Sequence, residues 1–431
     1  MCAAGLFLAA CTTGWSQSDL STITGTVRDS SGGGVPNAKV TARNEGTNVS
    51  RETRTNDSGV YTVSNIPAGR YAVTVEAQGF KKYESTGNLL DANIPLGVDV
   101  TLEVGGVNET VTITAEASRI QTEDATVGAT VDTYQVQNLM LNGRNPVLLA
   151  ALKPGVRSSA SLANFNFNLT DGGFSMNGSR PNDNVFFYDG AVATRTRSNG
   201  TSIGSADVNS TQEIQILTAN YNAEYGRSGG GQVRVVTKSG TRDFHGDAYE
   251  YFRNSAMDAN TWARNNSTLA VLNGQPQPLR FNQFGYDVSG PIYIPGHLNR
   301  DRNKLFFLFG QEWIRYRTSP ANTATVPDQA MRNGDFSELL GPNIYFSKTY
   351  NIVDPTSGAP FAGNIIPQSR LSQNGVALMR AYPLPTPGFL QGKANYIVSN
   401  TEIDNTRKDT ISADYLPSEK DSIRLRVLNY N

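Results

Sequence analysis

The stretch "KDTISADYLPSEKDSIRLRVLNY", Lys408 to Tyr430, carries the pattern that decides the fold class of this chain. Apolar residues alternate with polar ones in both of its halves, and the apolar positions are Ile411, Ala413, Tyr415, Ile423, Leu425 and Val427. Because successive side chains of a β-strand point to opposite faces, each half predicts a strand with one apolar and one polar face. The "PSEKD" between them predicts a short turn.

Three further strands are predicted upstream, at "DFHGDAYEYF", "NQFGYDVSGPIYI" and "KLFFLFGQEWIRYR". Each approaches the roughly ten residues that a tilted transmembrane strand requires. Aromatic residues near the strand ends suit a membrane girdle; they are Tyr249, Tyr251, Phe252, Trp313 and Tyr316. A long polar, proline-rich connection follows Arg317, which suits the long loops on one side of an outer-membrane barrel.

Residues 241–431 are therefore predicted to form the N-terminal strands of a transmembrane β-barrel, although the strands of a soluble β-sandwich would alternate in the same way. Five or so strands are too few to close a barrel, for which about eight are needed. We accordingly expect an incomplete barrel and a chain that is a fragment of a longer protein.

The region 19–105 consists of short alternating segments separated by turn residues, among them "STITGTV" and "VDVTLEV". This spacing predicts a small Ig-like β-sandwich. Ahead of it, the apolar "MCAAGLFLAAC" predicts a signal peptide over residues 1–18, cleaved near Ser18, with lipidation of Cys11 as the alternative. The two cysteines of the chain, Cys2 and Cys11, both lie in this leader, so we expect no disulfide after cleavage.

Residues 119–240 change to a mixed α/β pattern. The segments "TVDTYQVQNLMLNG" and "NPVLLAALKPGV" predict short helices, and "NVFFYDG" and "QVRVVT" predict buried strands. The glycine-rich "GRSGGGQV" leads into a strand and is not followed by the Gly-Lys-Ser/Thr of a phosphate loop. Nucleotide binding is therefore not expected in this region.

Composition disfavours several classes of function. The net charge is −1, from 37 Lys and Arg against 38 Asp and Glu, so no overall field would attract nucleic acid. The chain has two histidines, His245 and His297, and neither lies in a motif with metal-ligand spacing. We predict no catalytic residues, no metal site and no cofactor, and the protein is not expected to be an enzyme.

Three parts of the chain resemble known families. "GTVRDSSGGGVPNAKVTARN" and "SGVYTVSNIPAGRYAVTVEAQGF" resemble the carboxypeptidase regulatory-like domain, an Ig-like sandwich. "LNGRNPVLLAALKPGV", "FSMNGSRPNDNVFFYDG" and "EIQILTANYNAEYGRSGGGQVRVVTKSGT" resemble the plug domain of TonB-dependent outer-membrane receptors of the Oar-like group, and "FGYDVSGPIYIPGHLNRDRNKLFFLFGQEWIRYR" resembles the opening of their barrel. The resemblance implies a receptor in the outer membrane of a Gram-negative-type bacterium.

In that family a plug blocks the barrel, and a TonB-type energy-transducing protein of the inner membrane pulls on a short N-terminal peptide, the TonB box. The stretch "ETVTITA" lies in the predicted linker 106–118 and resembles such a box. The resemblance implies partner binding by Glu109, Thr110, Val111, Thr112, Ile113, Thr114 and Ala115. Its alternating Thr and β-branched residues favour an extended strand that can add to a partner's sheet edge, and the open alternative is that it extends the preceding sheet.

The predicted function is therefore active uptake of an unidentified substrate, a carbohydrate or a siderophore for example, across the outer membrane. The predicted partners are a TonB-type protein, outer-membrane lipid and a small-molecule or glycan substrate. The alternative is a surface structural or adhesion protein, in which the barrel is an anchor and the sandwich binds carbohydrate or protein.

Overall fold

The structure is a computed structural model that describes residues 19–431 with these exceptions: 107–108, 116–122, 124, 159–173, 196–201, 205, 223–225, 227, 267–273, 275 and 419–420. The predicted leader, residues 1–18, lies outside the described residues. The described part of the chain contains no helix that is long and apolar enough to cross a membrane. Two compact units are present, and residues 250–283 and 314–405 make up the second.

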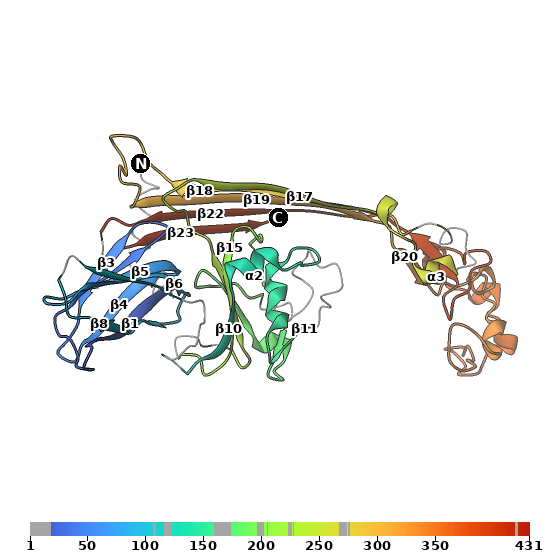
Figure 1. Cartoon of the computed structure of the whole chain (residues 1–431). Helices are drawn as coiled ribbons and strands as arrows, with labels where there is room; N and C mark the ends of the chain where they lie inside the picture. Colours follow the sequence, from blue (N-terminus) through green and yellow to red (C-terminus); the bar gives the residue numbers. More distant parts are fainter. Residues whose placement is uncertain are drawn as a thin grey trace, which may run out of the picture. The chain divides into compact units, whose positions relative to one another are not determined.

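The N-terminal region is a two-sheet sandwich, drawn in blue in Figure 1. One sheet contains β4 (Val60–Pro67), β1 (Leu20–Asp29), β7 (Leu96–Gly97) and β8 (Val100–Leu102). The other has the order β3 (Ser50–Arg54), β2 (Lys39–Asn44), β5 (Gly69–Glu76), β6 (Lys82–Leu90) and β9 (Thr110–Thr114). Alternate residues of these strands build the core, as Val40 and Ala42 of β2 do. The predicted Ig-like sandwich is confirmed.

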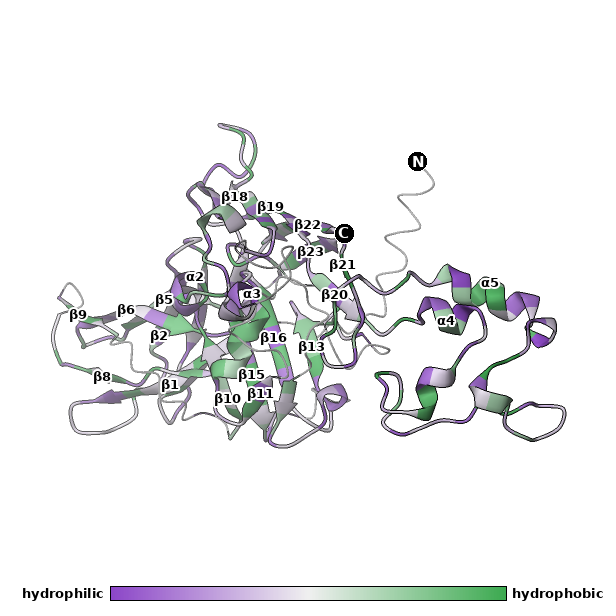
Figure 2. Ribbon diagram, turned by 90° about the vertical axis from the view of Figure 1, so that its right-hand side faces the viewer, coloured by the Kyte–Doolittle hydropathy of each residue, from purple (hydrophilic) through white to green (hydrophobic). Residues whose placement is uncertain are grey.

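The next region is an α/β domain with the sheet order β10 (Val127–Val131), β15 (Thr211–Ala219), β16 (Gln232–Thr237), β13 (Val185–Tyr188) and β14 (Ala191–Val192). Figure 2 shows the hydrophobic colouring of β13 and β16, which are buried along their whole length. A separate hairpin pairs β11 (Val156–Ser158) with β12 (Phe174–Met176). This domain lies within the segment 119–240 that the resemblance predicts to be a plug, and we use that name for it below.

The two predicted helices of the plug are short. Helix α2 (Thr133–Asn138) is capped by Asp132, whose side chain accepts a hydrogen bond from the Gln135 amide. The second, Pro146–Leu152, is a 3-10 helix. Asn145 caps it through the Val147 amide, and Pro146 occupies its first turn, where no amide donor is required. A further 3-10 turn, Pro181–Asp183, precedes β13.

Five long strands form one sheet in the order β17 (His245–Asn254), β18 (Leu279–Pro291), β19 (Leu305–Thr318), β22 (Glu402–Tyr415) and β23 (Ile423–Tyr430). All five predicted strands are therefore present. Strands β22 and β23 pair antiparallel, with Ser412 opposite Arg426. Among the described strands this sheet is open, with β17 and β23 at its edges.

The faces of β22 and β23 are inverted relative to those of a soluble sandwich. On β22 the polar row is buried and consists of Thr406, Lys408, Thr410, Ser412 and Asp414. The apolar row is exposed: Ile411 is 38% accessible, and Leu425 of β23 is 56% accessible. A soluble sandwich would bury the apolar row, whereas a membrane barrel turns it to lipid. Burial thus decides between two interpretations that alternation alone left open.

The second unit contains the long connections between these strands. Its regular elements are β20 (Ala321–Ala324), β21 (Tyr396–Ser399), α3 (Trp262–Asn265), α4 (Gln329–Arg332), α5 (Gln373–Ala381) and the 3-10 turns Ser255–Met257, Ser337–Leu340, Ala362–Asn364 and Gln368–Arg370. Local contacts hold the loops, such as the two hydrogen bonds from Arg370 to the Asp354 carboxylate, 2.8 and 3.0 Å. Those bonds lower the pKa of Asp354 below its usual range.

Candidate functional site

The predicted partner-binding stretch forms a strand at the edge of the sandwich. Strand β9 pairs parallel to β6, with Lys82 opposite Thr110 and Thr86 opposite Thr114. The Lys82 amide donates to the Glu109 carbonyl, and the Ala115 amide donates to the Thr86 carbonyl, both at 2.9 Å. The prediction that this stretch forms a strand is confirmed. The strand lies where the alternative interpretation placed it, because it extends the sheet of the preceding sandwich.

The register decides which backbone groups of β9 face outward. In a strand, the amide and carbonyl of one residue point to the same side, and the next residue points to the other. Because Glu109 and Ala115 bond to β6, the intervening odd residues, Val111 and Ile113, also direct their backbone groups to β6. The backbone groups of Thr110, Thr112 and Thr114 therefore face the edge that no described strand occupies.

The side chains of β9 leave this edge accessible. Its residues are exposed apart from the partly buried Val111, and Ile113 retains 47% of its surface accessible. At the start of the strand, Lys81 forms ion pairs with Glu109 at 3.2 Å and with Glu103 at 3.3 Å. Hydrogen bonding to Glu109, and then to Glu103, raises the pKa of Lys81. These solvent-exposed pairs hold the strand only weakly.

A buried polar contact, here called the sandwich–plug junction, connects the sandwich to plug strands β15 and β16. The Arg234 guanidinium lies 2.8 Å from the Asp19 carboxylate, and both side chains are at most 5% accessible. The Ala92 amide donates to Glu213 at 2.9 Å, and the Gln215 side-chain amide donates to the Ala92 carbonyl. Separating this junction would leave a buried charge without its partner, which is strongly unfavourable in free energy.

Burial raises the pKa of Asp19 to about 6, against the opposing effect of Arg234. The folded state therefore holds this proton more tightly than the unfolded chain, in which the pKa is 3.8. We expect the free energy of unfolding to fall as the pH rises from 4 to 6, by at most about 3 kcal/mol. Denaturant unfolding at pH 4.5 and 7 tests this, and Asp19→Asn should show a smaller difference between the two pH values. If the stability difference between the two pH values were equal in the parent and in Asp19→Asn, the assignment of this pH dependence to Asp19 would be contradicted.

A second buried polar cluster, here called the plug–wall junction, joins the plug to the five-stranded sheet. Lys408 of β22 and Glu312 of β19 form an ion pair at 2.9 Å with side chains 2% and 0% accessible. The Tyr249 hydroxyl donates to Glu312 at 3.0 Å. On the plug side, Asp207 is buried and accepts the Ser210 amide at 2.8 Å. Burial, followed by the nearby Glu312 carboxylate, raises the pKa of Asp207.

The functional residues of these two junctions were not singled out in the sequence. A usable signal existed for Arg234, because it is the one charged residue in the otherwise buried run "QVRVVT". Lys408 lies on the polar row of β22. The alternation predicted that row to be a polar face of the strand, without giving Lys408 a role of its own. Their partners could not be found by spacing, since Asp19 and Glu312 lie far away in sequence.

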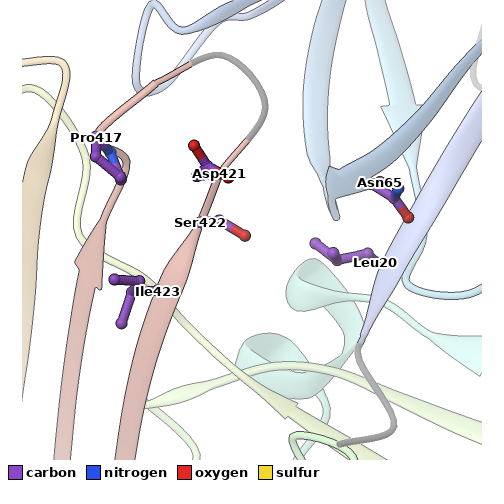
Figure 3. A pocket seen from close by; sticks show the side chains of 6 residues that line it. All are labelled: Leu20, Asn65, Pro417, Asp421, Ser422 and Ile423. Carbon is purple, nitrogen blue, oxygen red and sulfur yellow. The ribbon is translucent and has the colours of Figure 1, made fainter. Parts of the chain in front are cut away.

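One hollow in the described part of the chain was considered as a ligand site. A hollow of about 500 Å³ is lined by Leu20, Asn65, Pro417, Asp421, Ser422 and Ile423 (Figure 3). Its one carboxylate, Asp421, accepts a hydrogen bond from the Ser418 hydroxyl at 2.6 Å. Among the described residues no three His, Cys, Asp or Glu side chains are grouped so that they could hold a metal ion. We assign no substrate site to this hollow.

Comparisons with known proteins agree with this architecture. Residues 22–103 match the carboxypeptidase regulatory-like domain, and residues 236–431 match an outer membrane beta barrel domain. The chain is 28% identical over 321 residues to the TonB-dependent transporter Oar of Myxococcus xanthus, which covers 72% of this chain and 28% of that protein. The chain thus spans little more than a quarter of the length of this relative.

Two solved structures are also similar. The outer membrane transporter YddB from Escherichia coli has a TM-score of 0.36 and 11% identity, with 70% of this chain and 32% of that chain covered. The siderophore receptor PirA from Pseudomonas aeruginosa has a TM-score of 0.31 and 12% identity, with 72% and 37% covered. The two family models and the Oar relative confirm the predicted resemblance to Oar-like TonB-dependent receptors and a location in the Gram-negative outer membrane.

Proposed function

We propose that this homologue of Oar contributes the sandwich, plug and first barrel strands of a TonB-dependent receptor for active uptake across the outer membrane. The homology supports transport in general, and the assignment of Glu109 to Ala115 as the partner-binding segment is our own. One observation carries that assignment. Strand β9 presents the backbone groups of three threonines along an exposed edge, which is the geometry that strand addition by a partner requires.

The buried junctions supply a path by which a pull on β9 would reach the plug. Strand β9 is hydrogen-bonded to β6 of the sandwich. The sandwich is in turn joined to the central plug strands by Asp19 and Arg234. Because β9 is hydrogen-bonded to β6 along its length, a pull on β9 would load the sandwich as well as the chain that leads to the plug. In this proposal the sandwich is therefore a mechanical element and not an independent module.

A binding measurement tests the proposal directly. The detergent-solubilised chain is applied to an immobilised periplasmic domain of a TonB-type protein, and a peptide of residues 106–118 is added as competitor. We expect saturable binding that the peptide inhibits, whereas the same residues in scrambled order should not compete. Deletion of residues 109–115 should weaken binding by about tenfold or more, because several backbone hydrogen bonds are lost together. Binding that survives the deletion unchanged would contradict the assignment.

A further inference from the structure

The connection between β8 and β9 carries the chain from one sheet of the sandwich to the other. Lys81, which precedes β6, contacts both ends of this connection. Its ammonium group lies 3.3 Å from the carboxylate of Glu103, which follows β8, and 3.2 Å from the carboxylate of Glu109, which precedes β9. One side chain therefore bridges the point where the chain leaves the first sheet and the point where it enters the second.

The backbone and the aliphatic stem of Lys81 lie against the same connection. The Lys81 amide donates to the Glu103 carbonyl, and the Lys82 amide donates to the Glu109 carbonyl, both at 2.9 Å. The stem covers Gly105 so closely that a Cβ atom at this glycine would lie 2.6 Å from the Lys81 Cγ atom. Lys81 is thus seated along its whole length and not only at its charged tip.

The register of β9 needs such a contact, because the strand itself specifies it weakly. Strand β9 has five residues and pairs with β6 as its one neighbour among the described strands. Its sequence alternates threonine with a β-branched apolar residue, so a slip of two residues would keep a similar pattern on each face. A slip of one residue would direct the backbone groups of Val111 and Ile113 to the free edge. Either slip would change what a partner strand meets.

The ion pairs of Lys81 distinguish the observed register from the slipped ones. A slip of two residues would move Glu109 by about 7 Å along β6, out of reach of the Lys81 ammonium group. With Glu109 65% accessible and Lys81 28% accessible, this pair contributes little to overall stability. The alternative registers have similar backbone pairing, however, so a small difference in free energy decides their populations.

We propose that Lys81 is a positioning residue, which fixes the register of β9 on β6 and so presents the backbone groups of Thr110, Thr112 and Thr114 to a TonB-type partner. The inference rests on the proposed function, in which a partner strand adds to β9. It adds how the sandwich prepares that strand. An edge that is already in register binds more tightly, because the partner does not have to order it on binding.

The test combines hydrogen exchange of the detergent-solubilised chain with its affinity for the immobilised periplasmic domain of a TonB-type protein. Lys81→Met keeps the stem and removes the charge. Amide exchange over residues 109–115 should accelerate about threefold to fivefold, and the affinity should fall by a similar factor. Lys39→Met, which breaks the exposed pair with Glu52 at 2.7 Å on the same sheet, should change neither.

Two further measurements separate an effect of charge from loss of structure. Lys81→Arg keeps the charge and should restore both the exchange rate and the affinity. Raising the salt concentration from about 0.05 M to about 1 M screens exposed ion pairs, so the difference between the parent and Lys81→Met should shrink. If Lys81→Met instead accelerated exchange equally in β2 and β5, it would loosen the whole sandwich, and the assigned role would be wrong.

The outcomes distinguish failure of this inference from failure of the proposed function. Equal exchange over residues 109–115 in the parent and in Lys81→Met would overturn the control of register by Lys81. Faster exchange with unchanged affinity would overturn its role in presenting β9 to the partner. If deletion of residues 109–115 left the affinity unchanged, the proposed function would be contradicted, whereas an exchange difference between the parent and Lys81→Met would still support the control of register.

Discussion

The Thr112→Pro variant is expected to bind the periplasmic domain of a TonB-type partner about tenfold more weakly than the parent, while its sandwich stays folded. Thr112 directs its amide to the free edge of β9, so proline removes a donor that only the partner would use. Proline is tolerated on an edge strand where its missing amide faces away from the sheet. Surface plasmon resonance gives the affinity, and thermal unfolding followed by circular dichroism checks the sandwich.

The neighbouring position supplies the matched comparison. Val111→Pro removes a donor that faces β6, so it should lower the stability of the β6–β9 pairing and change partner affinity less than Thr112→Pro. Thr112→Ser keeps the amide and should behave like the parent. The opposite order, with Val111→Pro the more damaging for binding, would show that the partner pairs with the edge of β9 that faces β6. It would contradict recognition through the free edge.

The regular parts of this fold could be predicted because their signals are local. Alternation over Ile411–Tyr415 and Ile423–Val427 gives strands β22 and β23, and the turn residues of the N-terminal region give the sandwich. The second plug helix was less predictable, because a seven-residue apolar run beginning with proline fits a 3-10 helix as well as an α-helix. Its apolar side chains pack into the core in either form.

The pairing partner of β9 could not be predicted from local sequence signals. The composition of "ETVTITA" predicts an extended strand but does not state which strand it pairs with. That choice depends on the exposed edge of β6, which is formed by residues about thirty positions earlier. The plug–wall junction is likewise invisible in sequence, since Glu312 and Lys408 come together only when β19 and β22 become neighbours. The sequence predicted that Glu312 and Lys408 lie in strands, but it did not predict that they form an ion pair.

Lys408→Met is expected to lower the free energy of unfolding by about 3–5 kcal/mol at pH 7, the largest stability effect that we expect for a single substitution in this chain. The substitution preserves volume but leaves the Glu312 carboxylate buried without its cation. The matched double variant Lys408→Met with Glu312→Leu should recover most of the loss, because a buried apolar pair avoids the cost of desolvating charges. Denaturant unfolding of the detergent-solubilised protein measures all three.

The loss in Lys408→Met should also depend on pH. Lys408 is among the groups that lower the pKa of Asp207, so its removal raises that pKa further above its already elevated position. The folded state then holds the Asp207 proton more tightly, and stability is regained as the pH falls. The stability deficit of Lys408→Met should therefore be smaller at pH 5 than at pH 8.

Arg370→Gln, which breaks the more accessible pair with Asp354, should lower the free energy of unfolding by no more than about 1 kcal/mol. A similar cost for Arg370→Gln and Lys408→Met would show that the Glu312–Lys408 pair is solvated, and the plug–wall junction would then lose its assigned role.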